Sequence, residues 1–352
     1  MSRQEKIIEI LKAGTVIPAT PLALHSDRSF NPDGQRTLYR YYLDAGVGGL
    51  AVGVHTTQFE IRKPEIGLFE PVLRLAAEET DAFEKRTGKT IVKCAGICGP
   101  TEQAVKEAKL AKSLGFDAAL LSPGGLPSYT EDDFIKRTEA VAAILPVIGF
   151  YLQPSVGGRL FTYDYWRRLC EIDGVIAIKC ASFNRYQTLD VARAAAMSSR
   201  SDKIALFTGN DDNIVIDLLT TYKFEENGKT YTAHFVGGLL GHWCVWTNTV
   251  CRMFEMLREF SKQDYIPRNL LTLAEQVTDA NSAFFDSANG FAGCIAGVHE
   301  VLRRQGIMEG IWCLNPKETL SKGQSEEIDR VYRMYPDLND DEFVRENILK
   351  WK

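Results

Sequence analysis

The sequence has no apolar run long enough to cross a lipid bilayer. It also has no basic cluster: its 41 Lys and Arg residues are outnumbered by 46 Asp and Glu, and the formal net charge of -5 disfavours nucleic-acid binding. The segment from Met1 to Lys6 is charged and leads into a short amphipathic pattern, unlike the apolar region of a signal peptide. We therefore expect a cytoplasmic protein that binds neither membranes nor nucleic acids.

Closely spaced metal ligands are also missing. The eight cysteines are scattered, and the one close pair, Cys94 and Cys98, has no histidine nearby, which favours core packing over a metal site. Several cysteines lie inside apolar runs, as reduced thiols of intracellular proteins do. We expect no metal and no cofactor.

No glycine-rich phosphate-binding fingerprint follows the first apolar run, which disfavours a doubly wound nucleotide-binding sheet. Instead, short apolar runs alternate with amphipathic stretches at a spacing of roughly 30 residues, which is typical of βα units. This pattern predicts eight strands, at 15–20, 49–54, 90–97, 118–122, 147–152, 175–179, 205–208 and 233–239. Eight strands alternating with helices predict an α/β fold, a (β/α)8 TIM barrel.

The last third of the chain has a different character. No strand pattern is seen after Trp246, and helices are expected at 247–261, 266–287 and 288–304, with a further helix after Ser325. The sequence therefore predicts two parts. Residues 1–245 form the barrel with the active site, and residues 246–352 form a C-terminal helical appendage.

Lys179 stands at the end of the apolar run 175–180. A strand this rich in β-branched and small apolar residues is expected to be buried on both faces. A lysine at its carboxyl end would then point into a low-dielectric cavity, where its pKa falls and the neutral amine can attack a carbonyl to form a Schiff base. The alternative is a lysine whose amine reaches solvent at the strand end.

Tyr151 closes the preceding apolar run, 147–152. One helix-sized stretch separates the two runs, so they form a βαβ unit whose parallel strands end on the same side. We expect Tyr151 and Lys179 to face the same cavity, where the phenol can move protons during imine formation. The alternative is a packed aromatic residue with a satisfied hydroxyl.

The residues resemble those of the dihydrodipicolinate synthase/N-acetylneuraminate lyase family of class I aldolases. The resemblance rests on four segments in the family's order: a threonine-containing loop after the second strand, a Tyr-x-x-Pro strand end, an Ile-x-x-Lys strand and a Ser-Gly-Asp-Asp-like turn. They are Val54-His55-Thr56-Thr57-Gln58, Tyr151-Leu152-Gln153-Pro154, Ile176-Ala177-Ile178-Lys179 and Thr208-Gly209-Asn210-Asp211-Asp212. The resemblance implies a TIM barrel, a Schiff base on Lys179 with pyruvate or another 2-oxo acid, and a tetramer or dimer of identical chains.

The resemblance also implies which residues bind the substrate. Without a gap, His55 and Thr56 occupy the family's two threonine positions; with one inserted residue, Thr56 and Thr57 do. Either alignment leaves a hydroxyl and backbone N–H groups for a 2-oxo acid carboxylate. His55 is otherwise a neutral wall residue. Gly209 is expected in the same substrate site.

Other positions depart from the family pattern. The arginine that binds the synthase's second substrate is replaced by Val156, and Arg159, three residues on, either substitutes for it or is a solvated loop charge. The stretch after the fourth strand has no tyrosine until Tyr129, and Cys180 stands where a glutamate is usual. These losses argue against true dihydrodipicolinate synthesis.

We therefore predict a Schiff-base lyase or aldolase that cleaves or forms a C–C bond in pyruvate or a related 2-oxo acid. Two alternatives stay open: a dehydratase of 2-oxo sugar acids that uses the same lysine, and a catalytically silent barrel that acts as a binding protein. A metal or phosphate site at Asp211 and Asp212 is less favoured, because paired carboxylates at a strand end more often cap the next helix.

Overall fold

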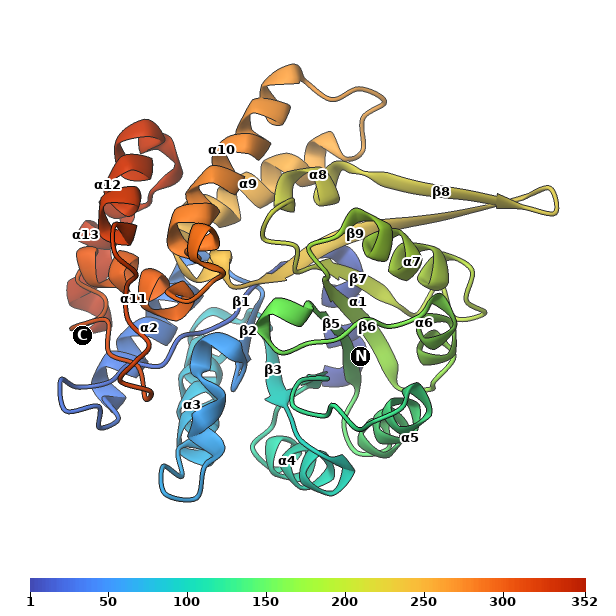
Figure 1. Cartoon of the computed structure of the whole chain (residues 1–352), viewed down its shortest axis with the longest axis horizontal. Coiled ribbons are helices and arrows are strands. Elements are labelled where there is room, and N and C mark those ends of the chain that lie inside the picture. Colours follow the sequence, from blue (N-terminus) through green and yellow to red (C-terminus); the bar gives the residue numbers. More distant parts are fainter.

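Eight parallel strands close into a barrel in the computed structural model, which describes residues 1–352 (Figure 1). In order around the barrel they are β1 (Val16–Pro18), β2 (Gly49–Val52), β3 (Val92–Ile97), β4 (Ala118–Leu121), β5 (Val147–Leu152), β6 (Val175–Ala181), β7 (Ala205–Thr208) and β9 (Lys229–Leu240). β1 pairs with β9, and a bridge between Ala19 and Ala51 completes the ring. The predicted (β/α)8 barrel is confirmed.

The barrel interior is filled by small and branched side chains. Every residue of β2 to β7 is buried, as expected for strands covered on both faces. The helix α1 (Arg3–Ala13) precedes β1, and its Ile7 and Leu11 join the apolar cluster inside the barrel. The amino-terminal end of the barrel is therefore closed by this helix, and the carboxyl end is left for the site.

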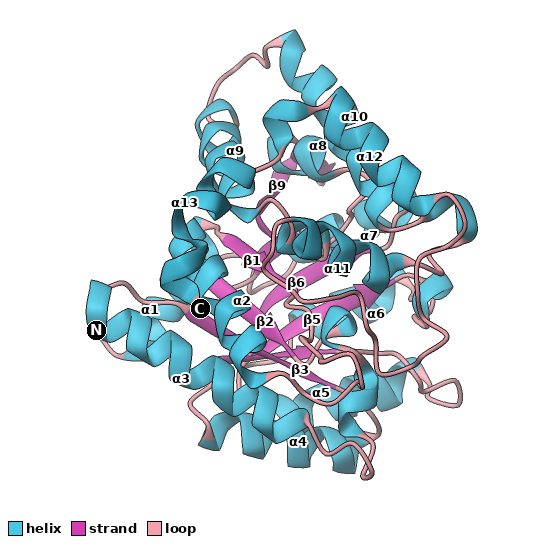
Figure 2. Ribbon diagram, turned by 90° about the vertical axis from the view of Figure 1, so that its left-hand side faces the viewer, coloured by secondary structure: helices cyan, strands magenta, loops and turns pink.

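The helices that connect the strands surround the barrel (Figure 2). They are α2 (Pro32–Ala45), α3 (Phe69–Thr87), α4 (Thr101–Ser113), α5 (Glu131–Ala142), α6 (Tyr163–Cys170), α7 (Arg185–Ala196) and α8 (Ile214–Leu219). Several begin at a capping residue; at α5, Thr130 and Asp133 form a reciprocal capping box. Their buried faces and the outward faces of the strands share one large apolar cluster.

A hairpin that the strand pattern did not predict extends from the barrel (Figure 1, right). The strand β8 (Thr221–Glu226) pairs antiparallel with the first half of β9. Asn227 and Gly228 make the turn with φ values of 51° and 74°, the left-handed conformation that a two-residue hairpin turn favours. β9 is therefore twelve residues long, and only its second half belongs to the barrel.

The C-terminal region is helical, as predicted, and lies on one side of the barrel (Figure 1). It comprises α9 (Thr247–Phe260), α10 (Arg268–Phe284), α11 (Cys294–Arg304), α12 (Gln324–Met334) and α13 (Asp341–Trp351). The third of these helices begins six residues later than expected, because Asp286 and Gly290 adopt left-handed backbone conformations that interrupt helical geometry. The division of the chain after residue 245 stays a prediction.

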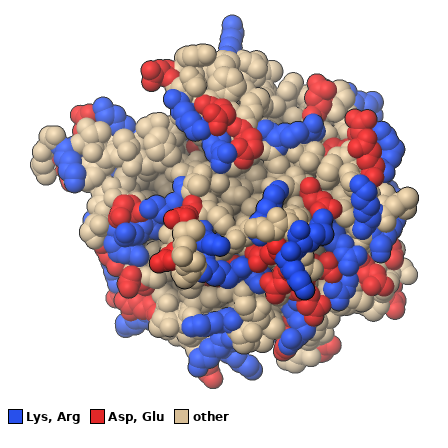
Figure 3. Space-filling view, turned by 180° about the vertical axis from the view of Figure 1, so that it is seen from behind, with Lys and Arg blue, Asp and Glu red and all other residues tan.

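The C-terminal helices pack firmly against the barrel. The Trp351 indole donates a hydrogen bond to Asp44 on α2 at 2.8 Å, and the Tyr41 hydroxyl donates one to Asp340 at the same distance. None of the helices combines the length and apolar character that a membrane crossing requires. Acidic and basic side chains mingle over the face seen in Figure 3.

Candidate active site

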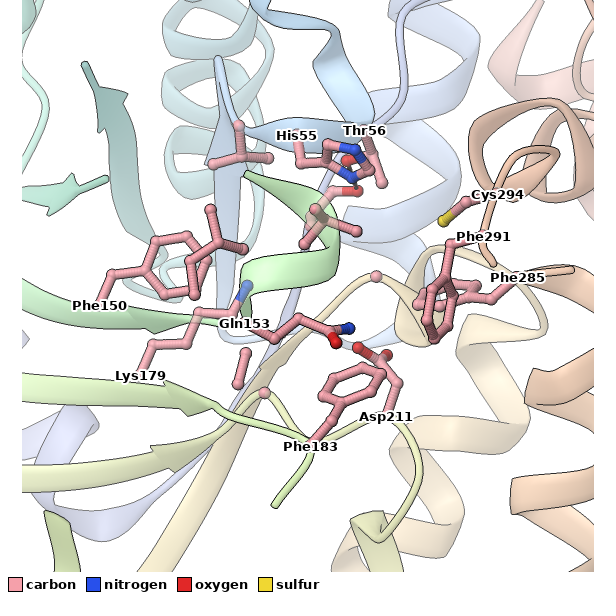
Figure 4. A pocket seen from close by; sticks show the side chains of 17 residues that line it. His55, Thr56, Phe150, Gln153, Lys179, Phe183, Asp211, Phe285, Phe291 and Cys294 are labelled. Atoms are coloured by element: carbon pink, nitrogen blue, oxygen red, sulfur yellow. Dashed lines mark hydrogen bonds between the residues drawn. The ribbon is translucent and has the colours of Figure 1, made fainter. Parts of the chain in front are cut away.

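A cavity of about 70 Å³ lies at the carboxyl ends of the barrel strands. At roughly 10–15 Å³ for each water-sized probe, it has room for a small organic molecule of a few heavy atoms. Most of the lining residues are apolar. The polar or ionisable side chains that line it are His55, Thr56, Gln153, Lys179, Asp211 and Cys294 (Figure 4).

Lys179 lies on β6 and extends its amine into this cavity (Figure 4). The side chain is buried and forms no salt bridge; its Nζ lies 4.4 Å from the centre of the Phe150 ring. Burial lowers the pKa of Lys179, and the nearby carboxyl of Asp211 opposes this change. A buried amine without a paired carboxylate is more readily neutral, which is the form that attacks a carbonyl.

A second buried strand lysine shows the contrast. Lys93, on β3, directs its amine to the carboxylate of Asp81 at 2.6 Å, so its charge is paired. Two lysines of similar burial therefore differ in chemistry: one stabilises structure through an ion pair, and the other points into a cavity. The expectation that Lys179 faces a cavity agrees with the structure; its catalytic role stays a proposal.

Gly209, which follows β7, makes room for the lysine side chain. A Cβ atom at this position would lie 2.7 Å from Cε of Lys179 and 2.9 Å from Cβ of Ala181. Both distances are shorter than those that Cβ atoms keep from their neighbours in proteins. The glycine also lines the cavity, as the sequence predicted. Its role is to let the lysine pass, since it has no side chain to offer a ligand.

We expect Gly209→Ala to slow reaction of Lys179 with a carbonyl compound by about a hundredfold, because a displacement near 1 Å from productive geometry has an effect of that order. The rate of adduct formation is measured in reactions with a 2-oxo acid and borohydride that are stopped at a series of times. Gly124→Ala is the matched control, since its Cβ would meet nothing closer than 3.3 Å. An unchanged rate in Gly209→Ala would show that Lys179 does not depend on this space.

The loop after β2 brings only part of the predicted carboxylate site to the cavity. His55 and Thr56 line it, whereas Thr57 lies beneath the loop and is fully buried. The Thr57 hydroxyl accepts the N–H groups of Gly53 and Val54 and donates to the Thr20 carbonyl at 2.7 Å. Thr57 therefore shapes the loop and does not line the cavity, so this structure gives no support to the expectation that it binds substrate.

His55 and Thr56 can both contact a ligand. The Thr56 hydroxyl donates to the Ala19 carbonyl at 2.6 Å, which fixes its position and leaves its lone pairs open. The backbone N–H groups of both residues have no acceptor in the protein. Burial and the charge of Lys179 lower the pKa of His55 to about 4, so its imidazole is neutral at pH 7.

The structure corrects the prediction that Tyr151 faces the cavity. Its ring points out of the barrel and packs against Trp166 and Phe161, with ring centres 5.1 and 6.0 Å apart. Phe150, not Tyr151, pairs with Lys179 in the sheet. The cause is an irregularity after Val147 that shifts the register by one residue, and a one-residue shift moves each side chain to the other face.

We therefore expect Tyr151→Phe to change turnover by less than about threefold, well below the hundredfold or more that removal of an acid–base group causes. The Tyr151 hydroxyl has no hydrogen-bond partner, so its loss leaves no other group unpaired. Steady-state kinetics with the best substrate measure the effect. A hundredfold loss of turnover with retained folding would return the phenol to the mechanism.

Arg159 is also placed away from the cavity. Its guanidinium stacks on the rings of Phe134 and Phe161, at 5.2 and 5.5 Å, and donates to the carbonyl of Tyr129. Arg159 does not line the cavity, so this structure gives no support to the expectation that it binds substrate. The side chain is held by aromatic rings and a carbonyl, so it packs a loop.

Asp211 is the residue that sequence reasoning placed in the wrong role. It lines the cavity and is buried, and its Oδ1 accepts the N–H of His242 at 2.8 Å. It does not cap α8, which begins after Asn213 without any side-chain capping bond. The signal was present in the sequence as a carboxylate directly after a buried strand.

A buried polar network holds the segment that carries Gly209 and Asp211. Its centre is Asp217 on α8, which is fully buried. Asp217 accepts hydrogen bonds from the side chains of Arg185, Thr208, Asn210, Asn213 and Tyr222. Because so many donors converge on one carboxylate, the turn after β7 is fixed relative to β6 and the lysine.

Phenylalanines form much of the remaining wall. Phe183 and Phe291 both have left-handed backbone conformations, with φ of 50° and 69°, and their rings meet edge to face at 6.0 Å. Phe285 and Phe291 come from the C-terminal region, so the appendage completes the cavity. Sequence reasoning missed these residues because nothing in a sequence pattern links Phe183 to positions a hundred residues later.

Comparisons with known proteins agree with this architecture. No protein-family model matches the chain. Among curated proteins it is 28% identical over 193 residues to a probable 5-dehydro-4-deoxyglucarate dehydratase of Streptomyces coelicolor, covering 54% of each chain. It is 32% identical over 117 residues to 4-hydroxy-tetrahydrodipicolinate synthase of Clostridium novyi, and 27% over 208 residues to N-acetylneuraminate lyase of Citrobacter koseri. These two matches span 33% and 58% of this chain, and 38% and 65% of the relatives.

Solved structures match over almost the whole chain. Dihydrodipicolinate synthase from Bacillus anthracis has a TM-score of 0.74 at 18% identity, over 93% of this chain and all of that one. N-acetylneuraminate lyase from Fusobacterium nucleatum, solved with pyruvate, has a TM-score of 0.67 at 18% identity, over 92% of this chain and 98% of that one. At such identities, these likenesses show the fold.

The chain is thus similar in sequence to distant members of the dihydrodipicolinate synthase/N-acetylneuraminate lyase family of class I aldolases, and it shares their fold. The members of this family are Schiff-base lyases and dehydratases. The curated relatives are matched over about half their length, so their individual activities do not transfer to this chain. No three His, Cys, Asp or Glu side chains gather closely enough to hold a metal ion.

Proposed function

We propose that the protein is a lyase that forms a Schiff base between Lys179 and a 2-oxo acid, and that it cleaves or forms a C–C bond next to the resulting imine. The observation that carries this proposal is the buried, unpaired amine of Lys179 in a cavity at the carboxyl end of the barrel. Enzymes of this fold place their active sites at this end.

The reaction begins when the neutral amine attacks C2 of the 2-oxo acid. Water is then lost, and the protonated imine withdraws electrons from C3, so a carbanion there is stabilised as an enamine. The carboxylate of the substrate is bound by the backbone N–H groups of His55 and Thr56, which have no acceptor in the protein. The neutral imidazole of His55 can donate a further hydrogen bond.

A second candidate is dehydration of a 2-oxo acid that carries hydroxyl groups, with the same lysine and the same enamine. The similarity to a probable 5-dehydro-4-deoxyglucarate dehydratase favours it. The two reactions diverge at the protonated imine: in the lyase the electrons of the breaking C–C bond form the enamine, whereas in the dehydratase loss of a C3 proton forms it and a C–O bond then breaks. Because their first steps are shared, one experiment covers both.

That experiment is reduction by borohydride during incubation with a panel of 2-oxo acids, followed by mass spectrometry of the intact chain and its peptides. The panel contains pyruvate, 2-oxobutyrate and a 2-oxo sugar acid. One reduced adduct per chain, on the peptide with Lys179, is expected. An adduct on another lysine, or none with any member, would refute the proposal. Assembly into dimers or tetramers stays a prediction.

A further inference from the structure

The cavity lacks the group that sequence reasoning assigned to proton transfer. Phe150 occupies the inward position beside Lys179, and Tyr151 is on the other face of β5. Formation of an imine and removal of a C3 proton both need a group that gives and takes protons at the reacting atoms. Another side chain of the cavity must supply it.

Most of the polar side chains in the cavity are unsuited to this task. Burial raises the pKa of Cys294 well above its ordinary value, so the thiol stays protonated. The Thr56 hydroxyl already donates to the Ala19 carbonyl. The amide of Gln153 does not ionise. His55 has a pKa near 4, which makes it a weak base, and it lies beside the N–H groups expected to hold the carboxylate.

Asp211 differs from these residues in three ways. It is the only carboxyl group that lines the cavity. Only its Oδ1 is engaged, by the His242 N–H at 2.8 Å; Oδ2 has no hydrogen-bond partner. Burial also raises the pKa of Asp211, so that both its acid and its base form are accessible near neutral pH.

The surroundings hold Asp211 in place without pairing its charge. The turn that carries it is anchored by the Asp217 network, and Gly209 in the same turn lies so close to Lys179 that an added Cβ atom would be 2.7 Å from its Cε. No arginine lines the cavity, and the amine of Lys179 forms no salt bridge. The carboxyl thus lies on a fixed wall of the cavity into which the amine of Lys179 also points (Figure 4).

We infer that Asp211 is the proton-transfer residue of this site, in the role that the sequence analysis gave to the phenol of Tyr151. The inference rests on the proposed Schiff base. The protonated carboxyl gives its proton to the carbinolamine hydroxyl, the C–O bond breaks, and water leaves as the protonated imine forms. The carboxylate then takes a proton from C3, the C–H electrons form the enamine, and Asp211 is again protonated.

Exchange of the methyl protons of pyruvate in D2O tests this step without any second substrate. Proton NMR measures the exchange rate, and borohydride trapping of the same sample measures imine formation. We expect Asp211→Asn to lower exchange by about two to four orders of magnitude. Asparagine can still accept the His242 N–H, so the adduct on Lys179 is expected to form at long incubation times.

Matched variants separate the outcomes. Asp212→Asn changes the neighbouring exposed carboxylate, which does not line the cavity, and is expected to exchange at the wild-type rate. If Asp211→Asn does not fold, Asp211→Glu and Asp211→Gln give the same comparison. The glutamate variant is expected to retain part of the exchange, and the glutamine variant is expected to lose it.

Two results would overturn the inference. One is wild-type exchange in Asp211→Asn, and the other is trapping without exchange in the wild type. Loss of exchange in His55→Gln, with exchange retained in Asp211→Asn, would assign the step to His55. If the wild-type protein traps no 2-oxo acid, the proposed function fails instead.

Discussion

A Lys179→Met variant is expected to lose both the covalent adduct with pyruvate and all measurable turnover. Methionine keeps the length and apolar stem of the side chain but has no amine, so no imine can form. Removal of a covalent nucleophile commonly lowers turnover by about four orders of magnitude or more. Mass spectrometry after borohydride reduction measures the first loss, and product assays measure the second.

Lys93→Met is the matched control, because it also changes a buried strand lysine but one that points away from the cavity. It removes a pair with Asp81, whose side chain is largely exposed, so no buried charge is left behind. Trapping on Lys179 is expected to persist in this variant. Adduct formation that survives in Lys179→Met, at any site, would show that a different amine is the nucleophile.

The pH dependence of trapping follows from the burial of Lys179. The folded-state pKa is lowered from the ordinary value of 10.5, so the neutral amine becomes available at lower pH than in an exposed lysine. Initial trapping rates are therefore expected to rise as Lys179 loses its proton, over a pH range below 10.5, and to fall at higher pH, where Asp211 no longer has a proton to give to the carbinolamine. In Asp211→Asn the midpoint of the rise is expected to move lower still, because the carboxylate that favours the charged amine is gone.

The barrel could be predicted from the sequence because its strands are short apolar runs at regular intervals. Burial on both faces leaves a continuous apolar signal, and the helices between them carry capping residues. The hairpin formed by β8 also has a signal, since Asn227 and Gly228 lie between alternating polar and apolar residues. The hairpin was not predicted because residues 233–239 were already assigned to the eighth strand of the barrel, and the strand was not expected to begin earlier.

A site residue could be predicted from the sequence only where its position along its own strand was enough to show that it faces the cavity. The place of Lys179 at the end of β6 follows from one apolar run. The orientation of Tyr151 does not, because it depends on a shift of one residue between β5 and β6 after Val147. Such a shift reverses which side chains face the interior, and composition does not reveal it.

Other parts of the site depend on contacts between distant segments. Phe285 and Phe291 reach the cavity from the C-terminal region, through a left-handed turn at Asp286 that no periodicity marks. Asp211 carried a sequence signal, but its role depends on whether the carboxylate turns toward α8 or toward the barrel. His242 decides this by donating its N–H to the carboxylate.

The last expectation concerns a second substrate that carries a carboxylate. Val156 lines the cavity and is partly exposed, and it stands where the resemblance places an arginine. The cavity contains no arginine, His55 is neutral, and the one lysine is consumed in the imine. Burial of an unpaired carboxylate costs several kcal/mol of binding free energy, so condensation of pyruvate with aspartate semialdehyde is expected to be negligible.

A pair of aldehydes of similar length measures this selectivity. With pyruvate as the first substrate, we expect butanal to be preferred over succinic semialdehyde by about a hundredfold in kcat/KM, which corresponds to about 2.7 kcal/mol. Val156→Arg supplies the missing cation and is expected to reduce this preference by about tenfold or more. Val156→Gln, of similar length but uncharged, is the control and is expected to leave the ratio unchanged. Strong use of succinic semialdehyde by the wild-type protein would mean that a cation outside the cavity, such as Arg159, moves to meet the carboxylate.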